Sequence, residues 1–146
     1  MTQDDPLMIS ELRRDEGVEY TPYMDTVGIP TVGVGHNLKE KPLPDDWIYP
    51  LTDEQVDQLL SEDLEVVFDG LDGYLPWWRK LDYVRQRVLI NMAFQLGIQG
   101  LLGFKNTLSA IQQGRYNAAA AGMSSSKWAL QTPNRVERLV DMMVNG

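Results

Sequence analysis

Two carboxyl side chains near the start of the chain have the types and the spacing that acid/base hydrolysis needs. Glu16 stands beside Gly17 at the expected end of a helix, and Asp25 follows nine residues later among turn residues. Hydrolysis of a sugar acetal needs one carboxyl group that gives a proton to the leaving oxygen, and a carboxylate that activates water across the ring. Thr31, six residues after Asp25, adds a hydroxyl that could help to hold this water.

The spacing alone leaves an ordinary structural interpretation open. The chain has 21 acidic residues, so a Glu and an Asp nine positions apart also arise by chance. Glu16 could be a solvated charge at a helix end, and Asp25 could be a turn former before Thr26. The surrounding sequence has to decide between these interpretations.

Three patterns around the two carboxyl groups predict the elements that position them. Apolar residues at helical spacing over residues 5–15 predict a helix that ends at or beside Glu16. Over residues 20–38, β-branched and aromatic residues are interleaved with Gly and Pro, which predicts a small β-ribbon. Residues 39–50 contain three prolines and are expected to form a loop.

The rest of the chain has helical patterns. Thr52 and Gln55 form a capping-box signature, which predicts a long helix from there to Gly70. A second, largely buried helix is expected over residues 81–96, ending at Gly97. Shorter helices are expected over residues 106–113, through Ala121, over residues 125–130, and from Thr132-Pro133 to Val144. The fold class is therefore α+β, mainly helical.

Length and composition narrow the class of protein. A chain of 146 residues can fold without disulfides or metals but is short for two independent domains, so we expect one domain. No apolar stretch approaches the roughly 18 residues of a membrane span, and no secretion signal is visible. The absence of cysteine excludes a thiol mechanism and a thiolate metal site. The net charge of −8 argues against nucleic-acid binding.

Three blocks of sequence resemble the lysozymes of T-even bacteriophages and their relatives. The first block comprises Asp15-Glu16-Gly17, Tyr23-Met24-Asp25-Thr26, Gly28 and Thr31-Val32-Gly33-Val34-Gly35-His36. The second is Ile90-Asn91-Met92-Ala93-Phe94-Gln95-Leu96-Gly97, and the third is Gln131-Thr132-Pro133-Asn134-Arg135. The blocks follow the family's order, and the resemblance covers most of the chain, from about Leu12 to Arg138.

The resemblance implies a role for each residue of the first block's site. Glu16 matches the family's general acid, Asp25 the carboxylate that orients or activates the attacking water, and Thr31 the hydroxyl that shares this water. The implied reaction is inverting hydrolysis of the β-1,4 bond between N-acetylmuramic acid and N-acetylglucosamine in peptidoglycan. It needs no metal or other cofactor. Inverting enzymes keep their two carboxyl groups roughly 6.5 to 9.5 Å apart, so that a water fits between them.

Further residues match supporting positions of the family. Phe94, Gln95 and Trp128 match residues that line its sugar cleft, although core packing is the alternative for the two aromatic residues. Arg135 matches an arginine beside the catalytic glutamate, the alternative being a surface cation at a helix start.

His36 is the only histidine in the chain. A lone histidine without cysteine supports neither a nucleophilic nor a metal site well. The resemblance pairs it with a carboxylate on the following long helix, here Asp63, so we expect a structural ion pair.

The resemblance also implies an organisation within the single domain of residues 1–146. We expect a small lobe with the β-ribbon over about residues 16–60, a linking helix over about residues 52–70, and a larger helical lobe. That larger lobe comprises about residues 71–146 and the N-terminal helix. Compared with the T-even enzyme, we expect a shorter stretch over residues 39–51 and no C-terminal extension, and the net charge is acidic.

The expected partner is the peptidoglycan glycan strand. We expect a monomer that binds no nucleic acid and forms no stable association with a membrane. It would accumulate in the host bacterial cytoplasm and reach the wall after a separate factor permeabilises the membrane. Two alternatives stay open: a lytic transglycosylase, and an inactive wall-binding or virion structural module.

Overall fold

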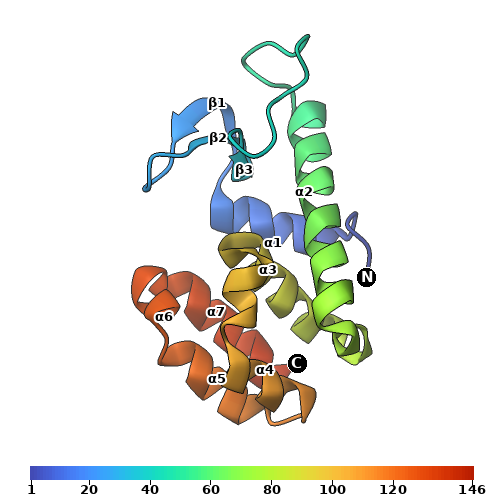
Figure 1. Cartoon of the computed structure of the whole chain (residues 1–146), viewed down its shortest axis with the longest axis vertical. Coiled ribbons are helices and arrows are strands. Elements are labelled where there is room, and N and C mark those ends of the chain that lie inside the picture. The colour runs from blue at the N-terminus through green and yellow to red at the C-terminus, as the bar shows by residue number, and fades with distance from the viewer. The chain divides into compact units, whose positions relative to one another are not determined.

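The computed structural model describes all 146 residues (Figure 1). Seven α-helices and one 3-10 helix accompany a single antiparallel sheet of three strands. This architecture confirms the predicted α+β, mainly helical fold class. Contacts within the chain define two compact units, residues 2–66 and residues 67–146 with Met1. We call them the ribbon unit and the helical unit; the predicted division into lobes remains a prediction.

The ribbon unit contains the predicted N-terminal helix and β-ribbon, drawn in blue in Figure 1. Its elements are α1 (Pro6–Glu16), β1 (Glu19–Met24), β2 (Pro30–Gly33), β3 (His36–Asn37) and the first turns of α2 (Asp53–Tyr74). The Asp5 carboxylate accepts a hydrogen bond of 2.9 Å from the backbone N–H of Met8, which caps the start of α1. The helix ends at Glu16, as predicted. Residues 39–50 form the predicted loop without a helix or strand.

The capping box at the start of α2 is present as predicted. The backbone N–H of Gln55 donates to the Thr52 hydroxyl at 3.1 Å, and the backbone N–H of Thr52 donates to the Gln55 side-chain oxygen at 3.0 Å. Each bond satisfies a donor that the helix itself leaves without a partner. One face of the helix is buried, comprising Val56, Leu59, Leu60, Leu64, Phe68 and Leu71.

The predicted end of α2 at Gly70 is wrong, because the helix continues to Tyr74. A Cβ atom at position 70 would lie 3.2 to 3.3 Å from the Ile98 side chain, which is tighter than ordinary packing. Gly70 therefore permits a close approach to Ile98 within the helical unit and does not stop the helix. A 3-10 helix over Pro76–Lys80 follows, which the sequence analysis did not predict.

The central helix of the helical unit is α3 (Tyr83–Leu102). Its N-cap Asp82 accepts a hydrogen bond of 3.1 Å from the backbone N–H of Arg85, and residues 88–93 are all buried, as predicted. The predicted end at Gly97 is half right. The backbone leaves helical geometry there, with φ 76° and ψ 160°, but the helix resumes and continues to Leu102.

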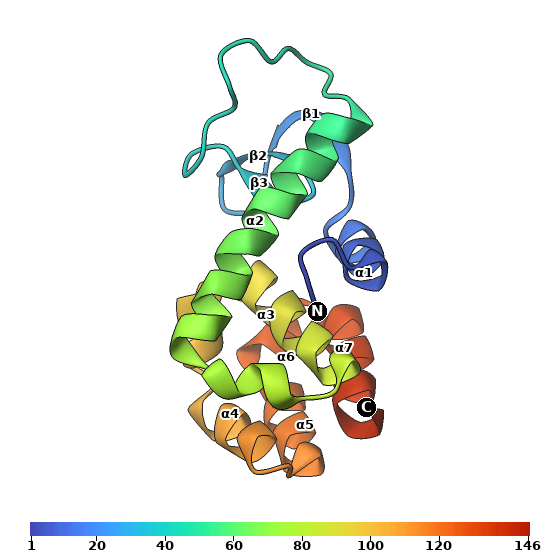
Figure 2. The ribbon, with the colours of Figure 1, turned by 90° about the vertical axis from the view of Figure 1, so that its right-hand side faces the viewer.

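Four shorter helices complete the helical unit: α4 (Lys105–Gln112), α5 (Tyr116–Ser124), α6 (Lys127–Gln131) and α7 (Pro133–Asn145). Helix α5 contacts α4 and α7, while α3 and α6 also contact α7 (Figure 2). The four segments agree with the predicted helices to within a few residues. The exception is the predicted capping role of Thr132, whose side chain makes no cap hydrogen bond. Its hydroxyl donates instead to the Trp128 carbonyl at 3.3 Å.

No single helix combines the length and the apolar character of a membrane span; α3 and α4 meet those criteria only as a pair bent by 106°.

Candidate active site

Glu16 is the last residue of α1, and its half-buried side chain reaches the turn between β2 and β3. Gly35 lies in that turn with a positive φ of 65°. A Cβ atom placed on Gly35 would be only 2.7 Å from Glu16 Oε1 and 3.4 Å from Glu16 Cδ. The backbone of residue 35 therefore lies directly against the carboxyl group, a position that only glycine can occupy without moving it.

Asp25 occupies the turn between β1 and β2, where the backbone holds one of its two carboxylate oxygens. Oδ1 accepts hydrogen bonds from the backbone N–H groups of Val27 at 2.9 Å and of Ile29 at 2.8 Å. The turn is closed by the backbone bond from Asp25 N–H to the Ile29 carbonyl at 3.0 Å. Oδ2 has no hydrogen-bond partner within the protein, so it can accept a hydrogen bond from a water molecule.

Thr31 lies on β2 and is buried apart from 5% of its surface. Its hydroxyl donates its only hydrogen to the Ile29 carbonyl at 2.8 Å. The oxygen can therefore only accept further hydrogen bonds. The backbone of Ile29 thus fixes both side chains, since its N–H binds Asp25 and its carbonyl binds Thr31.

The charges of both candidate carboxyl groups affect the pKa of Tyr23. Burial raises the pKa of the Tyr23 phenol above 10, and the charges of Glu16, Glu19 and Asp25 raise it further. Both Glu16 and Asp25 therefore lie near enough to act on the same side chain. Glu16, Asp25 and Thr31 all belong to the ribbon unit, and their catalytic roles remain predictions.

His36 on β3 is 1% exposed and lies between two hydrogen-bond acceptors of the ribbon unit. Nδ1 lies 2.8 Å from Asp63 Oδ2, and Nε2 lies 2.8 Å from the backbone carbonyl of Lys41. A ring that donates from both nitrogens is the protonated imidazolium. The contact with Asp63 that the sequence analysis expected is present.

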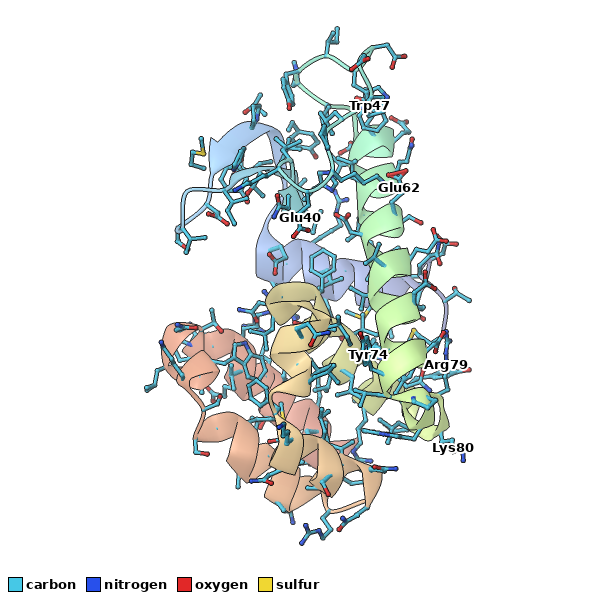
Figure 3. All side chains as sticks on the ribbon, viewed as in Figure 1. Glu40, Trp47, Glu62, Tyr74, Arg79 and Lys80 are labelled. Carbon is cyan, nitrogen blue, oxygen red and sulfur yellow. The ribbon has the colours of Figure 1, made fainter.

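The surroundings of His36 favour its charged form. Burial acts to lower the pKa of His36, but the hydrogen bond to Asp63, the charge of Asp63 and the Lys41 carbonyl together raise it above 6.5. The Lys41 ammonium also pairs with the Glu62 carboxylate on α2 at 3.2 Å. Figure 3 labels Glu62 and also Glu40, the residue before Lys41, so the place of this pair can be found there. Two ionic contacts therefore hold β3 and the segment that follows it against the first half of α2.

The predicted sugar-binding residues belong to the helical unit. The Trp128 indole N–H donates to Gln95 Oε1 at 2.8 Å, and Gln95 Nε2 donates to the Thr132 hydroxyl at 3.3 Å. Trp128 is only 4% exposed and packs edge-on against Phe104 at a centroid distance of 5.7 Å. Trp128 is thus mainly a core residue that orients the amide of Gln95. Phe94, the residue before Gln95, is half-buried.

Arg135 is on α7 and is 7% exposed, so it is not the surface cation that was the alternative interpretation. Its Nε donates to Asn91 Oδ1 on α3 at 2.9 Å. The predicted position of Arg135 beside Glu16 remains a prediction. The structure contains no group of three His, Asp or Glu side chains that could hold a metal ion.

Gly35 and Ile29 position the site, and neither role was predicted from the sequence. Gly35 follows Gly33 by two residues, a pattern that predicts only a turn, and the structure is needed to show that the Glu16 carboxyl group lies against it. Ile29 acts through its backbone, so its side-chain type carries no signal at all. Tyr23 belongs to the first block of the family resemblance, but nothing in the sequence separated it from the other residues of that block.

A carboxyl group at the end of a helix, with a second carboxyl group and a hydroxyl on a β-ribbon in a mainly helical chain, is an arrangement found in lysozyme-type glycoside hydrolases. A family model described as phage lysozyme matches residues 13–142. The chain belongs to the phage lysozyme family and is an enzyme of this class.

Relatives of this chain come from a cellular organism and from bacteriophages. It is 31% identical to the "Probable T4-type lysozyme 1" of Dictyostelium discoideum, covering 92% of each chain. It is 30% identical to the "Endolysin" of Salmonella phage P22, covering 86% of this chain and 84% of that one. A similarity of 30% to the "Pre-baseplate central spike protein Gp5" of Enterobacteria phage T4 covers 99% of this chain but 29% of the spike protein.

Proposed function

We propose that this peptidoglycan hydrolase cuts the β-1,4 bond between N-acetylmuramic acid and N-acetylglucosamine by an inverting mechanism. Glu16 is the general acid, and Asp25 with Thr31 holds the attacking water. Phage lysozymes and a protein named "Peptidoglycan hydrolase gp36" from Pseudomonas phage phiKMV, 31% identical over 91% of this chain, support the substrate class. The residue roles rest on the arrangement of the ribbon unit.

The proposed reaction is a single displacement at the anomeric carbon. The water oxygen forms a bond to that carbon while the bond to the bridging oxygen breaks and its electron pair stays with the bridging oxygen. Glu16 gives its proton to this oxygen, and Asp25 takes a proton from the water. Because the water enters from the face opposite the leaving sugar, the anomeric configuration inverts.

One observation carries this assignment, namely that Asp25 and Thr31 both offer only acceptors. Two backbone N–H groups occupy Oδ1 of Asp25, and the Ile29 carbonyl takes the hydrogen of Thr31. A water that donates one hydrogen to Asp25 Oδ2 and the other to Thr31 Oγ1 has its lone pairs free on its far side. Such a water is oriented for attack before the substrate binds.

The helical unit supplies the proposed glycan contacts. Phe94 offers an aromatic ring, and Gln95 offers an amide whose orientation Trp128 and Thr132 fix through hydrogen bonds. Amides and aromatic faces suit N-acetyl groups and pyranose rings. In this proposal Trp128 contributes mainly through Gln95, because it is almost completely buried.

The proposed biological role is lysis of the host cell by a monomer that accumulates in the cytoplasm and reaches the wall once the membrane has been permeabilised. The similarity to the spike protein of phage T4 supports a second candidate, in which the same catalytic domain acts from a virion. Detection of the protein in purified virions, as opposed to the lysate alone, would favour this second candidate.

Digestion of purified peptidoglycan tests the chemistry. We expect muropeptides that end in a reducing N-acetylmuramic acid, with the mass of one added water per cut, and proton NMR should show the α-anomer forming first. Products that lack this water and carry an anhydro ring would identify a lytic transglycosylase. Binding to peptidoglycan without any soluble product would identify an inactive wall-binding module.

A further inference from the structure

Tyr23 is placed at the candidate site by an irregularity in the ribbon. Glu19 pairs with Gly33 and Tyr23 pairs with Thr31, so four steps along β1 match two steps along β2. A regular continuation from Glu19 would set Thr21 opposite Thr31. The irregular segment contains Pro22, which has no backbone N–H for the ladder. Such bulges commonly re-aim a side chain beside an active site.

The register places the Tyr23 side chain on the same face of the ribbon as the Thr31 hydroxyl. Residues directly opposite in an antiparallel pair have Cβ atoms about 4.5 to 5.5 Å apart. The phenol also lies within electrostatic reach of Glu16 and Asp25. Tyr23 therefore lies beside Thr31 and within electrostatic reach of the two carboxyl groups, although the proposed mechanism gives it no role.

The hydroxyl of Tyr23 has no hydrogen-bond partner in the protein, in contrast to the other tyrosine of the same strand. Tyr20 and Tyr23 are both 37% exposed. The Tyr20 hydroxyl donates to Asp53 Oδ1 at 2.6 Å. An exposed hydroxyl without a partner in the chain is hydrated in the free protein, and a sugar oxygen can take the place of this water.

The chemistry around Tyr23 keeps this hydroxyl a hydrogen-bond donor. Burial and the charges of Glu16, Glu19 and Asp25 raise its pKa above the ordinary value of 10, so the phenol is uncharged at neutral pH. The nearby carboxylates only accept hydrogen bonds when ionised. A neutral donor on an aromatic ring can therefore bind a sugar oxygen without the proton transfer that the mechanism assigns to Glu16.

We propose that Tyr23 is a substrate-contacting residue, whose hydroxyl donates a hydrogen bond to an oxygen of the sugar bound at the cleavage point and whose ring packs against that sugar. The inference rests on the proposed function. It assigns to Tyr23 a binding role that is separate from proton transfer by Glu16.

A matched pair of variants tests this inference. Tyr23→Phe removes a hydroxyl that makes no hydrogen bond within the protein, so its melting temperature should equal that of the wild type. Its KM for soluble, uncross-linked peptidoglycan strands should rise about five- to tenfold, the effect of one lost hydrogen bond. Tyr20→Phe loses the bond to Asp53, so it should melt at a lower temperature with an unchanged KM.

Three outcomes would overturn the inference: an unchanged KM for Tyr23→Phe, a change in kcat alone, or a lower melting temperature that accounts for the loss. The Glu16→Gln variant, assayed in parallel, separates this failure from failure of the proposed function. If Glu16→Gln is inactive while Tyr23→Phe behaves as the wild type, only the role of Tyr23 is wrong. If Glu16→Gln retains activity, the proposed function itself fails.

Discussion

Replacing Gly35 by alanine should displace the Glu16 carboxyl group by a predictable mechanism. The new Cβ atom would lie 2.7 Å from Glu16 Oε1, whereas separations under 3.0 Å are essentially never seen. The obstructed atom is at the end of a flexible side chain, so the carboxyl group can move by several tenths of an ångström at little cost in folding free energy. A misplacement of about 1 Å in a catalytic group can cost about 100-fold in rate, so we expect at least a roughly tenfold loss here.

Gly33→Ala provides the matched control. Gly33 has a φ of 68°, against 65° at Gly35, so both substitutions strain the backbone alike. A Cβ atom at Gly33 would meet only Val56 and Leu59, at an ordinary distance of 3.8 Å. Left-handed backbone costs a non-glycine residue about 1 to 2 kcal/mol. Both variants should therefore melt about 2 to 8 °C below the wild type.

The assay is the loss of turbidity of permeabilised bacteria at 25 °C, with each variant's melting temperature measured in the same buffer. We expect Gly33→Ala to lyse cells at the wild-type rate and Gly35→Ala to be slow. Equal losses of activity in both would show that backbone strain is responsible. Full activity in Gly35→Ala would refute the argument that the position of Glu16 matters.

Three further predictions concern other contacts of the ribbon unit. Because the pKa of His36 is raised in the folded protein, its pairing with Asp63 should stabilise fully below pH 6.5 and less as pH rises through the folded value. Chemical denaturation across this range should show the decline, and Asp63→Asn should flatten it and cost about 1.5 to 3 kcal/mol at low pH. Thr31→Val should lose most of the activity while Thr31→Ser keeps it, with a failure of either pattern arguing against a hydroxyl that holds water. Thr52→Ala should lower the free energy of unfolding by about 1 kcal/mol without changing activity, and no change would show that the capping box is not formed.

The sequence predicted elements where local physics decides the structure. The capping box at Thr52 and Gln55 fixes the start of α2, since both of its hydrogen bonds lie within one helical turn. The interleaved glycines and β-branched residues of the ribbon likewise depend on backbone preferences that are local.

The sequence failed where a distant neighbour decides. Gly70 looks like a helix end because glycine is a poor helix former, but the approach of Ile98 requires the missing Cβ atom there. Thr132 looks like a cap, but its hydroxyl is engaged by Trp128 and Gln95. Ile98 and Gln95 lie far along the chain from the predicted positions, whereas Trp128 is only four residues before Thr132.

The same distinction applies to the candidate site. Its side chains Glu16, Asp25 and Thr31 could be proposed from residue type and a family resemblance. Asp25 and Thr31 are held by the backbone of Ile29, and Glu16 lies in the space left by the missing side chain of Gly35. Neither feature can be recognised from the type of a side chain. The register shift that turns Tyr23 toward Thr31 depends on the pairing of two strands.

The most direct test of the central claim is the lytic rate of purified Glu16→Gln, measured beside Glu19→Gln. Glu19 is a neighbouring carboxylate that also acts on Tyr23 but has no part in the proposed chemistry. We predict that Glu16→Gln folds with a melting temperature close to that of the wild type and loses about 100- to 10,000-fold in rate, the contribution of a general acid. Glu19→Gln should keep the wild-type rate. A folded Glu16→Gln that lyses permeabilised cells as fast as the wild type would contradict the account.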